Sequence, residues 1–416
     1  MDPVAVSRGP LSSHSSAGSS SEVAAAAAPR ARDDRRLLLA LSAAVFTINL
    51  DARVVAPLLP TMADELHVSI ARAGWLVSAY TLPYGLLQLA YGPLADRFGK
   101  ITVCAHAMAA FSIGTACCAA WPSFGAMLAL RALTGAAAAG LIPLTLAYIG
   151  DTVPYDERQG TIASLMASAG AAQAFSTGAG GTIAALLSWR AVFPCLGALA
   201  GAATLPLYLY RSRQTRVNSA GTRLQYLPVL RAKRMLPLLG LVFAEGFLYF
   251  GGFSFISGLL AHRFGLTAFP IGLILAGTGL SAMSTARVLK QLLVRFTART
   301  LLGAGGGALS LGYLACAVSP HWSLAFAGCC LMGTGFILCH TNLQTRATEI
   351  YPSARGTAVA LFAFALFLGS GVGTVVIGAV SSVIGFGYTF ALSSLLLAVF
   401  AAVVAATFGR ALHSET

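Results

Sequence analysis

From Leu37 onward the chain alternates between long apolar runs and short polar segments. A helix needs roughly 20 apolar residues to cross the hydrocarbon core of a bilayer. The pattern therefore predicts an all-α polytopic membrane protein with twelve transmembrane helices. The expected helices are residues 37–59, 71–94, 101–120, 123–149, 160–187, 191–210, 235–260, 269–291, 300–318, 321–345, 356–383 and 387–409.

The composition narrows the class of protein further. Of the 416 residues, 57% are apolar and 10% are charged, whereas a typical soluble domain is about 25% charged. This excludes a soluble enzyme, a disordered protein and a secreted disulfide scaffold. The eight cysteines all fall inside apolar runs without the spacing of zinc ligands, and we interpret them as small buried apolar residues. We therefore expect no metal and no cofactor.

The distribution of basic residues predicts how the chain is oriented in the membrane. Of the 27 Lys and Arg residues, 21 fall in the two tails or in loops on the side of the N-terminus, while the opposite loops hold Arg72, Arg190 and Arg263. Because cytoplasmic loops are enriched in Lys and Arg, both termini are expected to be cytoplasmic, in a plasma membrane, most simply a bacterial inner membrane. The net charge of +13 is interpreted as this topology signal, not as a nucleic-acid-binding surface.

The chain divides into two halves of six helices. Gly160-Thr161 and Gly356-Thr357 open the fifth helix of each half, 196 residues apart. Two halves in a parallel repeat are typical of transporters. The Ser- and Ala-rich start lacks the apolar region of a cleaved signal peptide. The expected segments are a disordered cytoplasmic tail (1–36), a six-helix bundle (37–210), a cytoplasmic loop (211–234), a second bundle (235–410) and a C-terminal tail (411–416).

The polar segment between the second and third helices reads Gly92-Pro93-Leu94-Ala95-Asp96-Arg97-Phe98-Gly99-Lys100. Its glycines allow a tight turn, and Asp96 and Arg97 can pair in a partly dry cytoplasmic gate. A phosphate-binding P-loop does not fit, since Ile101 stands where a Ser or Thr would bind magnesium.

This segment resembles the signature that the major facilitator superfamily carries between helices 2 and 3. The resemblance covers about residues 37–410 and implies two pseudo-symmetric six-helix bundles around a central cavity. In that family the loop is a conformational latch that bonds to the start of helix 11. The resemblance therefore implies latch roles for Gly92, Asp96, Arg97 and Gly99.

Two further segments resemble motifs of the drug:proton antiporters within that family. The run from Leu50 to Pro60 is similar to their helix-1 motif, with Arg53 and Ala56 in place of its Thr and Asn. The run that begins at Arg131 is similar to a helix-4 motif whose Arg is associated with proton coupling. The resemblance implies a proton-coupling role for Arg131.

Depth in the membrane independently places Asp51 near Arg131. Each residue is eight positions from the outer end of its expected helix, which puts both about 12 Å from the outer boundary. A charge at mid-membrane costs about 2.5–3.5 kcal/mol, so we expect an interior pair that couples protons, or else a structural ion pair. Arg53 lies about 200° around the helix from Asp51 and can instead extend toward the outer surface.

Glu245 is the other acidic residue expected near the midplane, ten positions into its helix among several Phe and Tyr residues. A carboxylate with aromatic neighbours suits a lipophilic, cationic or protonatable substrate, and Glu245 can also exchange protons. Tyr249, one turn on, is its expected aromatic partner. Ordinary packing is the alternative for the aromatic residues. His340 is a candidate for the substrate cavity, although a helix–helix hydrogen bond is its favoured role.

The fifth helix departs from the antiporter pattern. Residues 176–181 keep the Gly pair of the exporter motif but lack its Gly-Pro. We expect a monomeric secondary transporter that exports a small organic, drug-like or metabolite molecule by proton antiport with alternating access. Its partners would be the substrate, protons and the lipid bilayer. A proton-coupled importer or symporter is the alternative. A non-transporting receptor or enzyme is a remote one, since no nucleophile–base cluster supports catalysis.

Overall fold

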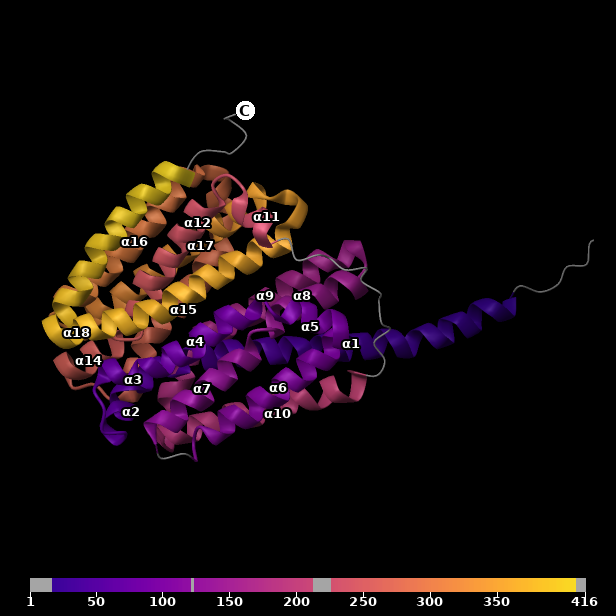
Figure 1. The fold of residues 1–416 in the computed structure, drawn as a ribbon, viewed down its shortest axis with the longest axis horizontal. Coiled ribbons are helices and arrows are strands. Elements are labelled where there is room, and N and C mark those ends of the chain that lie inside the picture. Colours follow the sequence, from indigo (N-terminus) through magenta and orange to yellow (C-terminus); the bar gives the residue numbers. More distant parts are fainter. Residues whose placement is uncertain (1–16, 121–122, 212–225, 409–416) are drawn as a thin grey trace, which may run out of the picture.

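The computed structural model describes residues 17–120, 123–211 and 226–408, with side chains from Arg35 onward. Every regular element in these ranges is helical (Figure 1), which confirms the all-α prediction. The N-terminal bundle contains α1 (Ala17–Val54), η1 (Ala56–Leu58), α2 (Leu59–Glu65), α3 (Ile70–Ala73), α4 (Trp75–Gln88), α5 (Tyr91–Phe98), α6 (Lys100–Cys117), α7 (Phe124–Ala138), α8 (Leu141–Thr152), α9 (Tyr155–Leu186) and α10 (Trp189–Tyr210).

The second half of the chain forms the C-terminal bundle. Its last helix bends at Gly385, whose φ of 79° is strained for any other residue. The bundle contains α11 (Tyr226–Arg231), α12 (Met235–Glu245), the π-helical turn η3 (Gly246–Phe250), α13 (Gly251–Phe253), α14 (Ile256–Phe264), α15 (Ala268–Arg295), α16 (Ala298–Val318), α17 (Trp322–Ile350), η4 (Pro352–Ala354) and α18 (Arg355–Phe408).

Nine helical segments of the described residues are long and apolar enough to cross a membrane. One of them, Pro352–Phe408, is 57 residues long and supplies two crossings, because the chain reverses at Gly385. The other two crossings are α4, which is only 14 residues long before the turn at Leu89, and α9, which is rich in small and hydroxylated residues. The twelve-helix fold predicted from the hydrophobic pattern is confirmed.

Local chemistry explains where several helices begin and end. Ser123, Ser188 and Thr297 accept a hydrogen bond from a backbone N–H three residues on, as N-caps do. The first membrane helix breaks after Val54 because Pro57 and Pro60 follow, and proline lacks the N–H that a helix interior needs.

Several predicted boundaries need correction. Helix α1 begins at Ala17, within the segment of 36 residues for which a disordered tail was expected. The Ala-rich run in this segment has high helix propensity. Residues 1–16 and 411–416 lie outside the described residues. The 211–234 loop contains the short helix α11, and its residues 212–225 also lie outside the described part.

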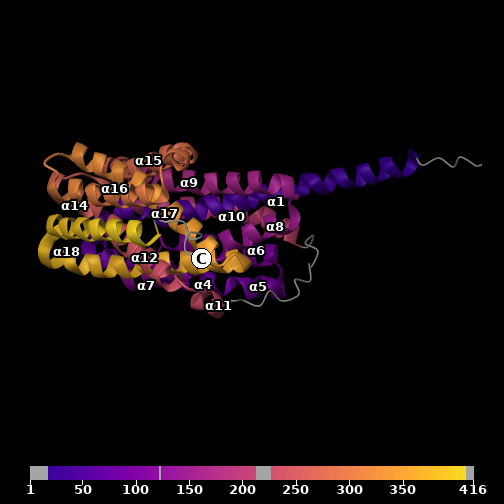
Figure 2. The same cartoon turned by 90° about the horizontal axis from the view of Figure 1, so that it is seen from above.

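The two bundles lie side by side and are joined mainly by α9 against α15 and by α4 against α18. We call the side that holds α2, α3 and Gly385 the distal side, and the side that holds Arg35, α5 and α11 the proximal side. In Figure 1 the bundles meet near α2, α3 and α14 and diverge near α8. On the proximal side Tyr226 of α11 still donates to the carbonyl oxygen of Leu89, at the end of α4, at 2.9 Å. Figure 2 shows α1 leaving the bundles on the proximal side.

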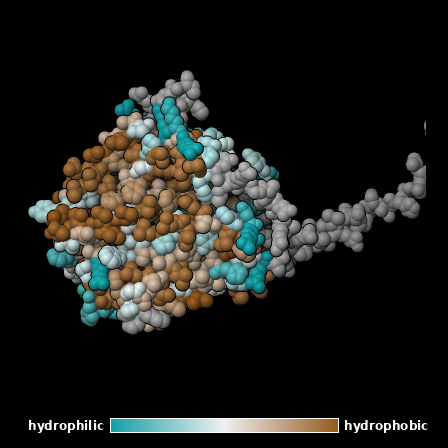
Figure 3. Space-filling model, viewed as in Figure 1, coloured by the Kyte–Doolittle hydropathy of each residue, from teal (hydrophilic) through white to brown (hydrophobic). Residues whose placement is uncertain are grey.

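The bundles expose a broad apolar face, as a membrane protein should. Figure 3 shows hydrophobic residues covering the middle of the molecule, with hydrophilic residues toward its ends. Inside each bundle a separate apolar core forms, one around Leu41, Phe111 and Leu144 and the other around Leu309, Phe362 and Leu397. Separate cores allow the bundles to move as two bodies, which alternating access requires.

Candidate functional site

A fully buried ion pair lies inside the N-terminal bundle. Nη1 of Arg131 on α7 donates to Oδ2 of Asp51 on α1 at 2.7 Å. The Asp51 side chain is 0% exposed and the Arg131 side chain 1%. The Arg131 guanidinium also stacks on Tyr80, with its carbon 4.4 Å from the ring centroid. The structure therefore brings together the two residues that were expected to meet at matched depth.

The pair is only partly satisfied by hydrogen bonds. Oδ1 of Asp51 and Nε of Arg131 have no partner among the described residues. An unpartnered carboxylate oxygen in a buried site is a position where a proton can bind and change the local charge. A proton on Asp51 would remove its attraction for Arg131, so the arrangement can convert protonation into a mechanical change.

Arg53, two residues after Asp51, turns to the opposite face of α1. Its guanidinium carbon lies 3.7 Å from the ring centroid of Phe250 in the C-terminal bundle and 6.0 Å from that of Phe253. It therefore does not extend toward the outer surface, which corrects one expectation. The reason is geometric, because a step of about 200° around the helix takes Arg53 from the core of its own bundle to the neighbouring one.

A second acidic residue, Glu245, is buried in the C-terminal bundle. Its Oε2 lies 3.1 Å from Nδ1 of His340 on α17, and its side chain is 0% exposed. The contact is a hydrogen bond between the carboxylate and the imidazole, and which group donates depends on the tautomer of His340. Oε1 has no partner among the described residues. The π-helical turn η3 starts directly after Glu245, and such turns are frequent at functional sites.

This contact changes the role expected for Glu245. A carboxylate that selects cations needs an exposed oxygen, whereas Glu245 is fully covered and faces His340. The geometry does not favour the cation-selecting role. His340, 18% exposed, makes the helix–helix hydrogen bond that was its favoured interpretation.

Aromatic side chains connect these groups into one column. The ring of Tyr249 stacks on Phe336 at 5.1 Å between centroids, and Phe336 stacks on His340 at 4.6 Å. Phe250 meets Phe336 edge-on at 5.0 Å. Tyr249 and Phe250 are buried, while Phe336 and His340 are partly exposed. Tyr249 thus joins the predicted site through its stacking on Phe336.

The segment predicted to be a latch is disengaged in this structure. Asp96 and Arg97 are exposed, and neither has a hydrogen bond or ion pair within the described ranges. The expected Asp96–Arg97 pair and the bond to the start of helix 11 are absent there. Gly99, with a φ of 88°, forms the turn into α6, and Gly92 opens the same segment within α5. Bundles that are spread apart on the proximal side leave these residues without partners.

The small residues of the fifth helix serve close packing. A Cβ added to Gly180 would lie 2.6 Å from Cγ2 of Val54 on α1, and one added to Gly181 would lie 2.5 Å from the carbonyl oxygen of Ala268 on α15. This segment therefore touches both bundles, although it lacks the proline of the exporter motif.

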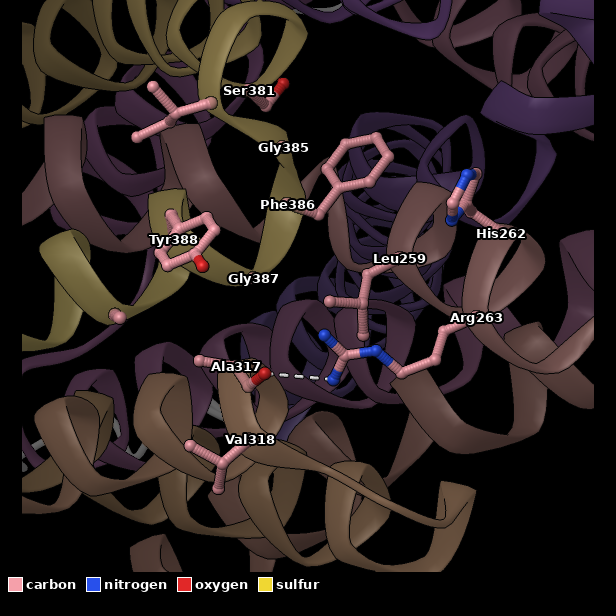
Figure 4. Close-up of a pocket in the computed structure, with 12 residues that line it drawn as sticks. Leu259, His262, Arg263, Ala317, Val318, Ser381, Gly385, Phe386, Gly387 and Tyr388 are labelled. Carbon is pink, nitrogen blue, oxygen red and sulfur yellow. Dashed lines mark hydrogen bonds between the residues drawn. The ribbon is translucent and has the colours of Figure 1, made fainter.

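A separate pocket of about 840 Å³ lies on the distal side of the C-terminal bundle. Figure 4 shows Arg263 within it, donating to the carbonyl oxygen of Ala317 at 2.9 Å. The pocket contains none of the predicted site residues, and Arg263 is engaged with the end of α16, so we assign it no substrate. Within the described chain no group of His, Cys, Asp or Glu could hold a metal ion.

Sequence reasoning missed three of the aromatic partners, Tyr80, Phe336 and Phe362. Phe336 lies one helical turn before His340, so helical periodicity could have indicated it. Tyr80, which contacts Arg131, and Phe362, whose ring lies 5.0 Å from that of His340, come from other helices and could not be found in this way. Arg53 was another available signal, because an arginine without an acidic neighbour in a membrane helix needs a partner.

Comparisons with known proteins agree with this architecture. The family model of the Major Facilitator Superfamily matches residues 41–374. The uncharacterized MFS-type transporter YceJ of Bacillus subtilis is 28% identical over 346 residues, which cover 81% of this chain and 87% of that protein. The chloramphenicol resistance protein of Pseudomonas aeruginosa is 26% identical over 77% of this chain and 78% of its own length.

A solved structure has the same fold. A bacterial homologue of the human lysosomal transporter Spinster, in an inward-facing and occupied conformation, superposes with a TM-score of 0.75 at 19% identity, over 90% of this chain and 96% of that one. At this identity the likeness concerns the fold alone. Since the family model spans most of the sequence, the chain belongs to the Major Facilitator Superfamily and is a multi-pass membrane transporter, not an enzyme.

Proposed function

We propose that this transporter exports a small organic molecule in exchange for protons. The observation that carries the proposal is the buried Asp51–Arg131 pair, whose acid keeps one unpartnered oxygen. The similarity to a chloramphenicol resistance protein supports export of a drug-like compound. The chain would act as a monomer in a plasma membrane, most simply a bacterial inner membrane, with its termini, and thus its proximal side, in the cytoplasm.

The pair couples a proton to movement through charge. A proton that binds Oδ1 of Asp51 neutralises the carboxylate and weakens the hold on Arg131. The guanidinium then keeps its stacking on Tyr80 but loses its charged partner. Because α1 also carries Arg53 against the other bundle, a shift of α1 changes how the bundles meet. Glu245, with its own unpartnered oxygen, provides a second place for a proton.

The latch segment belongs to the other half of the cycle. Asp96 and Arg97 are exposed when the bundles are apart on the proximal side, so they would form their bonds only when this side closes. The distal contacts described here would then open. Two alternative sets of contacts, one on each side of the membrane, are what alternating access needs.

Reconstitution into proteoliposomes with an imposed pH gradient tests the proposal. Wild-type protein should move a panel of labelled drug-like compounds against their gradient only when protons flow the other way. Asp51→Asn keeps the shape and removes the proton site, so it should abolish gradient-driven accumulation while exchange of substrate across the membrane continues. Accumulation by Asp51→Asn equal to wild type would overturn the coupling role.

A proton symporter is the second candidate, favoured by the missing Gly-Pro in residues 176–181. The same vesicles decide between the two directions. In protein of known orientation, an antiporter moves substrate opposite to the protons, whereas a symporter moves both together.

A further inference from the structure

We infer that the substrate is an aromatic organic anion and that Arg53 is its charge partner at the junction of the two bundles. The inference deepens the proposed transport function and rests on it, because a ligand bound at this place is a substrate only if the protein transports it. It replaces the cationic substrate that the sequence suggested. The argument starts from the position of the Arg53 guanidinium.

Arg53 is the mid-membrane cation that lacks an acid. No hydrogen bond or ion pair of its guanidinium occurs among residues 35–120, 123–211 and 226–408, and its only ring contacts are with Phe250 and Phe253. Phe250 is the sixteenth residue of the 30-residue segment Met235–Phe264, so the guanidinium sits near the middle of that crossing. An unpaired charge at such a depth is costly and marks a path for a charged ligand.

The stacking on Phe250 leaves the binding edge of Arg53 available. At 3.7 Å from the ring centroid, the guanidinium carbon lies over the face of the ring. No N–H group of this guanidinium donates a hydrogen bond to a described residue, so its donors are not used within the described chain. A guanidinium edge presents paired donors that match the two oxygens of a carboxylate. Arg53 is only partly buried, so part of its side chain is accessible.

The neighbouring charges do not cancel that of Arg53. Asp51 faces the other way and is bound to Arg131 at 2.7 Å. Glu245 is completely buried behind His340. Neither carboxylate therefore contacts Arg53, whose guanidinium forms no ion pair with a described acid. A cation would be repelled there, while an anion would be attracted in surroundings that screen charge poorly.

The aromatic column gives the ligand its second feature. Phe250, Phe336 and His340 form a continuous set of rings that starts at Arg53. Phe336 and His340 are partly exposed, so they offer ring faces and edges to a planar apolar group. Aromatic pairs prefer offset or edge-on contacts, and apolar walls with few polar groups are typical of ligand sites. The arrangement fits a ring that bears a carboxylate.

Equilibrium binding to purified protein in detergent tests the inference without any gradient. Three probes share one ring system and differ in charge: naphthylacetate, naphthylacetamide and naphthylethylammonium. Since hydrogen bonds to charged groups contribute about 1.5–3 kcal/mol, wild type should bind naphthylacetate about tenfold or more tightly than the neutral amide. The ammonium probe should bind weakest.

Three variants locate the preference. Arg53→Gln should bring the affinity ratio of naphthylacetate to amide close to one, and Arg53→Lys should retain part of it. Phe250→Leu should weaken both probes together. The control is Arg72→Gln, since Arg72 is also an arginine near a ring, Phe124 at 5.4 Å, but lies on the distal side. Thermal unfolding checks that each variant is folded.

Each outcome decides the matter. No preference for naphthylacetate in wild type, or an unchanged preference in Arg53→Gln, overturns the inference. The same holds if Arg53→Gln changes the distance between the bundles but leaves the affinity ratio intact, since Arg53 is then only a contact of the closed side. Because binding is measured without protons flowing, failure of proton exchange in vesicles would leave a positive result standing.

Discussion

The ring of Phe255, in the C-terminal bundle, fills the space beside Gly74 in the N-terminal bundle. A Cβ added to Gly74 would lie 2.6 Å from Cζ of that ring, which is fully buried. On its other side the same ring abuts Gly378 of α18, where an added Cβ would lie 2.7 Å from Cζ. The ring thus sits between two glycines from different bundles and closes the distal side.

Substitution of Gly74 by valine should force the distal side open. The added carbons cannot fit while Phe255 stays in place, so the equilibrium should shift toward the conformation in which the bundles separate there. Spin labels at positions 187 and 383, whose native Leu and Val are 71% and 83% exposed on the two bundles, should report a longer distance in a background without native cysteines.

Gly125→Val is the control, because Gly125 begins a helix on the same side with nothing within 4 Å of the added Cβ. It should leave the label distance unchanged. If Gly74→Val also leaves it unchanged while the protein stays folded, the ring of Phe255 does not act as the distal closure.

The buried pair should show strong energetic coupling in stability. Removing one partner of a buried ion pair costs about 3–5 kcal/mol because the other charge is stranded. Asp51→Asn leaves the buried charge of Arg131 without a partner, so thermal unfolding should occur well below the wild-type temperature. Arg131→Gln should lower the unfolding temperature similarly, because it strands the charge of Asp51.

The double variant distinguishes a pair from two independent sites. Asp51→Asn with Arg131→Gln strands no charge, so its loss of stability should be smaller than the sum of the single losses. Additive losses would mean that the 2.7 Å contact contributes little.

The latch residues should affect the equilibrium between conformations and not the stability of this one. Asp96 has no polar partner within the described chain, so Asp96→Asn removes no hydrogen bond or ion pair from this conformation. It does weaken any bond that Asp96 forms when the proximal side closes. Labels at positions 155 and 294, where the exposed fractions are 85% and 83%, should show a larger population at the long distance.

Asp156→Asn is the control for Asp96→Asn, because Asp156 is also an exposed acid on the proximal side, in the first turn of α9. It should not alter the distance distribution. Identical distributions for Asp96→Asn and wild type would argue that this segment has no latch role.

Much of the fold follows from local rules, and the site follows only in part. Periodic apolar runs predict helices wherever they occur, and a charge in lipid predicts a partner, so Asp51 and Arg131 could be matched by depth alone. Glu245 and His340 could not be matched, because the choice of neighbour depends on how α12 and α17 rotate about their axes.

Arg53 illustrates a second limit. Its angle around α1 was predictable, but whether that face meets lipid or another bundle depends on how the two halves dock. The extension of α1 back to Ala17 shows a third, since composition that suggests a disordered tail also contains five consecutive alanines, Ala24–Ala28, with high helix propensity.

Two glycines of α9, Gly181 and Gly178, allow a matched test of how closely the bundles pack. Gly181 and Gly272 face each other across α9 and α15, where an added Cβ would lie 2.5 Å from a carbonyl oxygen of the opposite helix in each case. Gly178 lies on the same helix, but a Cβ there would meet only the Cβ of Ala276 at 3.6 Å, an ordinary contact.

Gly181→Ala should therefore separate the two helices and lower both the unfolding temperature and the transport rate, whereas Gly178→Ala should have little effect. Both variants add one methyl group to a helical glycine, so the helix-propensity gain of about 1 kcal/mol is common to them. Thermal unfolding and vesicle transport of the two proteins side by side then isolate the packing. Equal behaviour would mean that α9 and α15 can move apart without cost, and that the small residues of this segment do not hold the bundles together.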